Sequence, residues 1–94
     1  MATYVMFGKY SAEAMKGASA KRTADAKAVL ERYGGQLKAV YGLLGETDLV
    51  VIADFPGTAE AAKTSLALTR LTGISFVTSP ALTVEELDKL ISEL

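Results

Sequence analysis

The sequence predicts an α+β domain in which two helices cover one face of a four-stranded antiparallel sheet. Three observations lead to this prediction. The chain has 94 residues, a length that suits one domain spanning residues 1–94. Short segments rich in β-branched and aromatic residues alternate with segments whose apolar residues recur at helical spacing. Two of the strand-like segments are separated only by a short polar turn, which favours an antiparallel hairpin.

The N-terminal third predicts a strand followed by an interrupted helix. The segment TYVMFGKY, from Thr3 to Tyr10, is rich in residues that are typical of strands. Ser11 can cap the next helix, because its hydroxyl can accept from the free backbone N–H groups at the helix start. Helical spacing continues to Tyr33, with a break expected near residues 17–19, since glycine is unfavourable inside a helix. The Gly34-Gly35 pair ends the helix.

The next segments predict the hairpin. Strands are expected at Gln36 to Leu44 and at Asp48 to Phe55, on either side of the turn Gly45-Glu46-Thr47-Asp48. Because the connection is so short, the two strands must run antiparallel. Pro56-Gly57 ends the second of them.

A second long helix follows the hairpin. Thr58 is expected to cap it, and Gly73 to end it. The residues expected to form its apolar side are Ala62, Leu66, Ala67, Leu68 and Leu71. This helix should pack on the sheet beside the first one.

The last segments predict a fourth strand and a short helix. The strand, ISFVTS, runs from Ile74 to Ser79 and is ended by Pro80. Thr83 and Glu86 form a capping box, three residues apart, at the start of the helix. The helix carries four apolar residues at helical spacing, Leu87, Leu90, Ile91 and Leu94. The element order β-α-β-β-α-β plus a C-terminal helix is that of a ferredoxin-like fold, with the first and third strands in the middle of the sheet.

The composition excludes several classes of chemistry. The chain has no cysteine and no histidine, which removes thiol nucleophiles, thiolate zinc sites and the commonest metal ligand. We therefore expect no metal and no resident cofactor. The formal net charge of −1 provides no general attraction to nucleic acid or to anionic membranes. No leader or membrane-spanning run is recognisable, so a cytoplasmic location is expected.

The strands are apolar on both faces. An antiparallel sheet with one face in water shows alternating apolar and polar residues, and these strands do not. In the third strand both alternating sets are apolar, Leu49, Val51, Ala53 and Phe55 in one and Val50 and Ile52 in the other; in the first strand the sets are Tyr4 and Met6, and Val5 and Phe7. The helices cover one face, so a second copy of the chain is expected to cover the other, in a homodimer or higher oligomer. The sequence does not decide which set meets the partner.

Three segments of this chain resemble the GYD-domain family. They are YGLLGETDLVVIADFPG, from Tyr41 to Gly57, the opening YVMFGKYS and the later TGISFVTSPA. The family's name refers to a Gly-Tyr-Asp motif, typically with the tyrosine just before the aspartate; Gly45 and Asp48 match it, whereas Thr47 stands where the tyrosine would. The resemblance implies a dimeric α/β barrel built from ferredoxin-like domains. The hairpin is also similar to that of leucine- and asparagine-responsive regulators, in which this turn lies by a subunit interface that binds amino acids.

The polar residues beside strand ends are the candidate ligand-binding residues. They are Tyr10, Lys16, Arg22, Tyr41, Gly45 and Asp48. The hypothesis places a ligand between the turn of one chain and either the sheet face or the start of the first helix, in the same or another subunit, where Arg22 can bind a carboxylate or phosphate. Each residue also has a structural interpretation: the turn as a hairpin corner, the basic residues as a solvated helix face and the tyrosines as core.

Two function hypotheses follow. The first is a binding or sensor module that holds a small molecule or a partner at a subunit boundary. The second is a cofactor-independent oxygenase or isomerase of the dimeric α/β-barrel type. An enzyme would need a base, and the available groups are Lys9, Lys16, Glu46, Asp48 and Asp54. Of these, Asp54 ends an apolar strand, so burial there would raise its pKa. The absence of histidine and cysteine favours the binding module.

Overall fold

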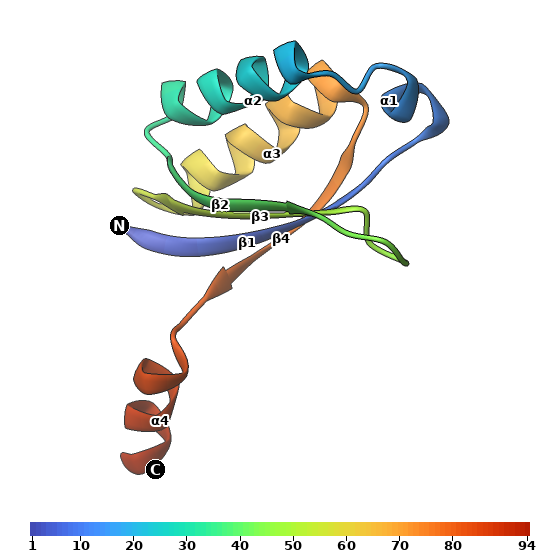
Figure 1. The fold of residues 1–94 in the computed structure, drawn as a ribbon. Coiled ribbons are helices and arrows are strands. Elements are labelled where there is room, and N and C mark those ends of the chain that lie inside the picture. Colours follow the sequence, from blue (N-terminus) through green and yellow to red (C-terminus); the bar gives the residue numbers. More distant parts are fainter.

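Two long helices lie across one face of a four-stranded antiparallel sheet in the computed structural model, which describes all of residues 1–94 (Figure 1). In chain order the elements are β1 (Ala2–Lys9), α1 (Ala12–Lys16), α2 (Ala20–Arg32), β2 (Gln36–Gly42), β3 (Leu49–Phe55), α3 (Thr58–Thr72), β4 (Ser75–Ala81) and α4 (Val84–Ser92). The strand order is β2-β3-β1-β4, with β1 and β3 in the middle. The ferredoxin-like prediction is confirmed.

The core lies between this sheet and the helices α2 and α3. It contains Tyr4 and Met6 from β1, Val51, Ala53 and Phe55 from β3, Leu30 from α2, and Ala61 and Leu68 from α3. The rings of Tyr4 and Phe55 meet edge to face, with centroids 5.8 Å apart. The Tyr4 hydroxyl lies 3.2 Å from the hydroxyl of Thr58, which gives this buried phenol a polar partner. Tyr4 is thus a core residue.

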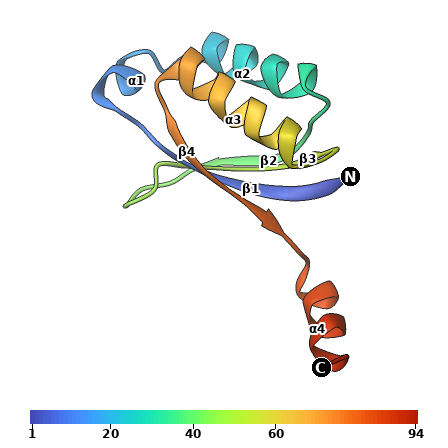
Figure 2. The same cartoon turned by 180° about the vertical axis from the view of Figure 1, so that it is seen from behind.

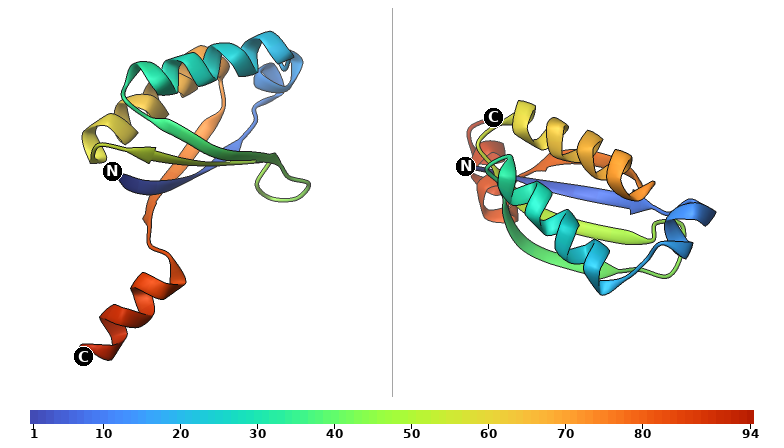
Figure 3. Two further views of the ribbon diagram at one scale, coloured as in Figure 1. Left: turned by 60° about the vertical axis from the view of Figure 1, so that its left-hand side comes forward. Right: turned by 90° about the horizontal axis from the view of Figure 1, so that it is seen from above.

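The predicted break in the first helix is present. The short helix α1 ends at Gly17, and α2 begins after Ser19. Ser11 and Ser19 each cap a helix, accepting from the backbone N–H of Ala14 and Arg22 respectively, each at 3.0 Å. Because α1 and α2 have separate caps, the chain changes direction between them (Figure 3, right).

The second long helix differs from its prediction in two ways. Its N-cap is Gly57, and Thr58 is its first residue, so the predicted Thr58 cap is wrong. The buried residues of α3 are Ala61, Thr64, Leu68 and Thr72, whereas Leu66 and Leu71 are exposed. Two threonines are buried because each hydroxyl donates to a backbone carbonyl four residues earlier, at 2.9 and 2.7 Å.

The fourth strand continues beyond the predicted end. Pro80 lies within β4, opposite Tyr4 of β1, and the strand ends at Ala81. Proline is tolerated there because β4 is an edge strand, whose outer side needs no hydrogen-bond donor. The strand therefore carries the chain past the body of the domain.

The last helix, α4, stands away from the rest of the chain. Figures 1 and 2 show it on the side of the sheet opposite α2 and α3, at the end of the extended segment that follows β4. The predicted capping box at Thr83 and Glu86 is present. None of the residues of α4 is buried, including those of its apolar side.

The face of the sheet that α2 and α3 leave uncovered is apolar. We call it the open face; its central residues are Val5, Phe7, Tyr41, Val50, Ile52 and Val77. Cross-strand partners lie together on it, with Val5 opposite Ile52 and Phe7 opposite Val50. Phe7, Tyr41 and Val77 are exposed in the single chain. The structure thus identifies which of the two apolar sets is free to meet another molecule.

Candidate functional site

An apolar cavity lies between α2, α3 and the covered face of the sheet. It has a volume of about 320 Å³, and 12 of its 16 lining residues are hydrophobic. The sheet contributes Leu37, Val40, Leu49, Val51 and Phe76; the helices contribute Leu30 and Leu68, and Ile74 precedes β4. We call this cavity the α2 pocket. Its volume is at the lower end of the range for small-molecule sites, about 300 to 1,000 Å³.

The α2 pocket exists because the first half of α2 has short side chains. Ala20, Ala24 and Ala26 line it together with Thr23. Larger side chains at these positions would fill the space between the helix and the sheet. The small residues were visible in the sequence, but no sequence pattern shows which face of a helix lies above a void.

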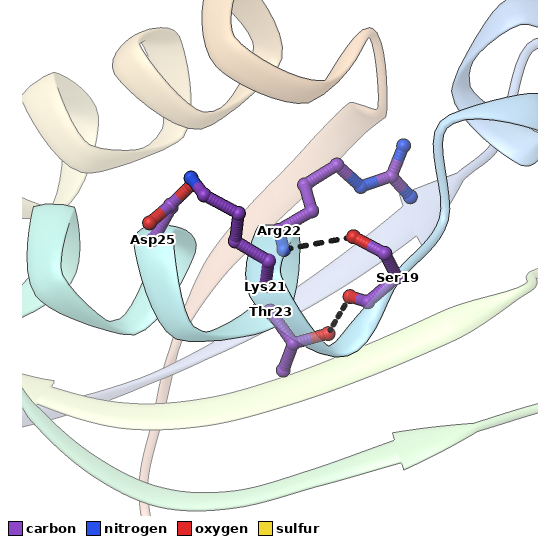
Figure 4. Close-up of polar contacts among 5 residues, drawn as sticks. All are labelled: Ser19, Lys21, Arg22, Thr23 and Asp25. Carbon is purple, nitrogen blue, oxygen red and sulfur yellow. Dashed lines mark hydrogen bonds and ion pairs between the residues drawn. The ribbon is translucent and has the colours of Figure 1, made fainter.

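Polar groups lie at the end of the α2 pocket that is next to the N-terminus of α2, near Tyr10 and Arg22. The backbone N–H of Arg22 donates to Ser19, while its guanidinium points away from Lys21 and Asp25 (Figure 4). The guanidinium lies 5.7 Å from the centre of the Tyr10 ring and donates to the carbonyl of Ala14. Arg22 is in no salt bridge, since the two ion pairs of the chain are Lys21–Asp25 and Lys38–Asp54.

The charges that line the α2 pocket are all positive. Arg22 and Lys27 are among the lining residues, and no aspartate or glutamate is. Lys21, by contrast, is exposed and pairs with Asp25 at 2.9 Å, which raises the pKa of Lys21 through that hydrogen bond. Helix α2 thus presents the paired cation Lys21 to solvent and places two cations without an ion-pair partner, Arg22 and Lys27, beside the cavity.

Asp48 holds the hairpin turn against the end of β1. Its carboxylate accepts from the backbone N–H of Tyr10 at 2.9 Å, and its own N–H donates to the carbonyl of Gly8 at 3.0 Å. Its carbonyl accepts from Leu43 across the turn at 2.8 Å. The carboxylate therefore satisfies a backbone donor of another segment, so Asp48 positions Tyr10 at the edge of the α2 pocket.

The structure does not bring all the predicted site residues together. Tyr10 and Arg22 line the α2 pocket, and Asp48 contacts Tyr10. Lys16 is exposed on α1 and Tyr41 is exposed on the open face, so neither lines the pocket. Gly45 is exposed at the turn with a φ of 152°, which is the backbone role expected of glycine there.

The space beside Gly8 is filled by neighbouring side chains. A Cβ at Gly8 would lie 3.0 Å from side-chain atoms of both Ile74 and Phe76. The missing side chain of Gly8 therefore allows close packing of β1 against its neighbours.

Asp54 is not a base with a raised pKa. Its carboxylate accepts from the Thr3 hydroxyl at 2.7 Å and pairs with Lys38 at 3.3 Å. The hydrogen bond from Thr3 has the largest effect and lowers the pKa of Asp54. Burial opposes it, and the hydrogen bond and charge of Lys38 lower the pKa further. The expectation of a raised pKa is wrong, because cross-strand polar partners stabilise the ionised form.

The side chains and helices of the structure include neither a metal-binding cluster nor a membrane-spanning helix. No three acidic side chains lie close enough together to bind a metal ion. None of the four helices combines the length and the apolar character needed to cross a bilayer.

Comparison with known proteins gives the family. The GYD domain matches residues 4–91, nearly the whole chain. The chain belongs to the GYD domain family. No curated protein matches it. In this GYD domain Gly45 lies in the hairpin turn, and Asp48 holds that turn against β1 through its N–H, which donates to the carbonyl of Gly8.

A regulator of known structure has a similar fold. It is the Mycobacterium tuberculosis leucine response regulatory protein (LrpA), whose crystal structure aligns with a TM-score of 0.57 at 12% sequence identity. The alignment covers 87% of this GYD domain and 51% of the LrpA chain, so the domain spans about half the length of that regulator. At this identity the likeness concerns the fold.

Proposed function

We propose that this GYD domain is a homodimeric, cytoplasmic binding or sensor module that holds a small apolar molecule with an anionic group in the α2 pocket. One observation supports the proposal above the others. A largely apolar cavity lies beside a guanidinium that has no carboxylate partner. Ligand sites usually combine apolar walls with a few oriented polar groups, and this arrangement has both.

The polar groups define the kind of ligand. A guanidinium binds carboxylate or phosphate in a planar, two-point geometry, and Arg22 uses one of its nitrogens on Ala14. The other nitrogens remain for an anion, and Lys27 adds a second positive charge. An acyl or aryl carboxylate fits best, because its apolar part matches the hydrophobic walls and its charge matches the cations.

The experiment is a titration of the protein with hexanoate and octanoate, monitored by two-dimensional NMR and by calorimetry. Each acid is compared with the corresponding alcohol. We expect amide shifts around the α2 pocket and tighter binding of the acids. Arg22→Gln should weaken carboxylate binding by about 1.5 to 3 kcal/mol, the typical value of a charged hydrogen bond, and leave alcohol binding unchanged.

The matched control is Lys21→Gln, which removes the same charge from the adjacent residue. Its side chain is exposed and paired with Asp25, so we expect no change in affinity. Ala26→Leu should reduce binding of acids and alcohols alike, because the larger side chain occupies the cavity. Equal losses in Arg22→Gln and Lys21→Gln, or amide shifts outside the lining residues, would contradict the proposed site.

The proposed homodimer uses the open face. Val5, Val50 and Ile52 lie on it, and a second copy of the same face would remove them from water. Light scattering at micromolar concentration should give the mass of two chains, and Phe7→Asp should give one. A wild-type chain that remains a monodisperse monomer would contradict this assembly.

A further inference from the structure

The C-terminal arm, residues 82–94, has an apolar side that its own chain leaves exposed. Val84, Leu87, Leu90, Ile91 and Leu94 have exposed fractions between 46 and 100%. We propose that this arm packs against the body of a second copy, so that the two chains of the dimer exchange arms. The inference rests on the homodimer proposed above and assigns a function to a segment that the α2 pocket does not use.

The arm is built to be helical but is too short to be stable alone. The Thr83 hydroxyl accepts from the N–H of Glu86 at 3.0 Å, and the Glu86 carboxylate accepts from the N–H of Thr83 at 3.1 Å. Even with this capping box, α4 has only nine residues, and isolated helices below about 12 to 15 residues are marginal in water. Its apolar side therefore needs a surface to pack on.

The geometry of the chain directs the arm away from its own body. Thr83 has φ −66° and ψ 156°, so the chain stays extended between β4 and α4. No glycine occurs between Ala81 and Leu94 to favour a reversal. The left-hand view of Figure 3 shows α4 well beyond the sheet, on the side of the open face. A second chain placed against the open face would lie on the same side as the arm.

The charges favour a dimer in which each arm packs on the body of the other chain over one in which the two arms pack on each other. The arm carries four acidic residues, Glu85, Glu86, Asp88 and Glu93, and one basic residue, Lys89. The body, residues 1–81, carries nine basic and seven acidic residues. Two arms would therefore repel each other, whereas an arm and a body attract.

The size of the open face also favours exchanged arms. Four strands of about seven residues present roughly 450 Å² of flat area, taking a strand spacing of about 4.8 Å and a rise of about 3.3 Å per residue. A stable interface buries about 800 Å² of accessible surface per partner. The uneven surface of the side chains raises the area that the sheet contributes, and the arm adds six large apolar side chains to it.

The first experiment asks on which chain the arm lies. Because the chain has no cysteine, Ser92→Cys can carry a single nitroxide spin label at the end of α4. Spin-labelled chains without ¹⁵N are mixed with ¹⁵N chains that carry no spin label, and the two are allowed to exchange subunits. We expect broadening of body amides in the ¹⁵N chains. Broadening that occurs only when label and isotope share one chain would show an arm folded on its own body, and would overturn the proposal.

The second experiment measures the strength of the arm contact. The double variant Leu87→Ser/Leu90→Ser should raise the dimer dissociation constant by about a hundredfold or more, because apolar burial is lost in both copies. The control Glu85→Gln, on the same helix, should change it by no more than about threefold. Circular dichroism and the NMR spectrum of the body should remain those of a folded domain in both variants.

The outcomes separate the arm from the dimer itself. If Phe7→Asp dissociates the dimer and the double serine variant does not weaken it, the dimer forms through the open face and the arm exchange is refuted. A wild-type monomer would remove both. The exchange would also be overturned if the protein is a dimer, no amide broadening passes from one copy to the other, and the arm instead contacts an unrelated protein.

Discussion

Replacing Asp48 by alanine tests whether the GYD turn is a structural contact or a binding site. The Asp48 carboxylate accepts from the partly buried N–H of Tyr10 at 2.9 Å, in a contact between segments 38 residues apart. Alanine leaves that N–H without a partner. The loss of a hydrogen bond to a charged group, with the donor left unpaired, costs about 1 to 3 kcal/mol.

The magnitude can be expressed as a melting temperature. For a domain of this length, 1 kcal/mol corresponds to roughly 4 to 8 °C. A loss of about 1.5 kcal/mol therefore predicts a decrease of roughly 6 to 12 °C for Asp48→Ala. Asp48→Asn should recover about half of it, because the amide oxygen still accepts but carries no charge.

Calorimetric melting curves of the three proteins provide the measurement. All must be recorded at one protein concentration, because the melting temperature of a dimer depends on it. Octanoate titrations of the same samples then compare affinities. We expect a small loss of affinity, through the displaced Tyr10, compared with that of Arg22→Gln. If Asp48→Ala melts like wild type and loses binding as completely as Arg22→Gln, the turn is a ligand site and the structural assignment fails.

Two further predictions concern the packing and the pH dependence of the fold. In urea unfolding, Gly35→Ala should destabilise the domain by about 1 to 3 kcal/mol, because the new Cβ would lie 2.6 Å from a ring carbon of Phe55. The control is Gly42→Ala, whose Cβ meets nothing within 4 Å and which should change the free energy of unfolding by about 0.5 kcal/mol or less. The pKa of Asp54 is lower in the folded state because its carboxylate accepts from Thr3. The wild type should therefore be more stable than Asp54→Asn above about pH 4, and this difference in the free energy of unfolding should disappear as the pH falls through the folded pKa. A difference that is unchanged at pH 2 would contradict the assignment.

Local features of this chain were determined by the sequence itself. The capping box of Thr83 and Glu86, the break before Ser19 and the hairpin around Gly45 depend on residues within a few positions of one another. Such patterns can be recognised because the interacting groups lie next to each other along the chain. The strand order followed as well, because a short turn and right-handed connections leave few arrangements of four strands.

The buried side of α3 was decided by the tertiary structure. The leucines at 66 and 71 suggested an apolar side that includes both, yet the sheet and α2 contact the side with Ala61, Thr64 and Thr72. Small residues fit there because helix and sheet approach closely, and the hydroxyls are satisfied within the helix itself. Side-chain hydropathy therefore predicted the burial of Leu68 correctly but placed Leu66 and Leu71 on the wrong side.

The candidate site was likewise decided by contacts that are distant in sequence. Lys21 and Arg22 are adjacent and carry the same charge, but one side of α2 places Lys21 beside Asp25 and the other places Arg22 beside Tyr10 and the α2 pocket. The cavity itself requires α2, α3 and the sheet to be in position together. Sequence spacing determines which residues can share a helix side, whereas the packing of that helix determines which side meets a void and which meets solvent.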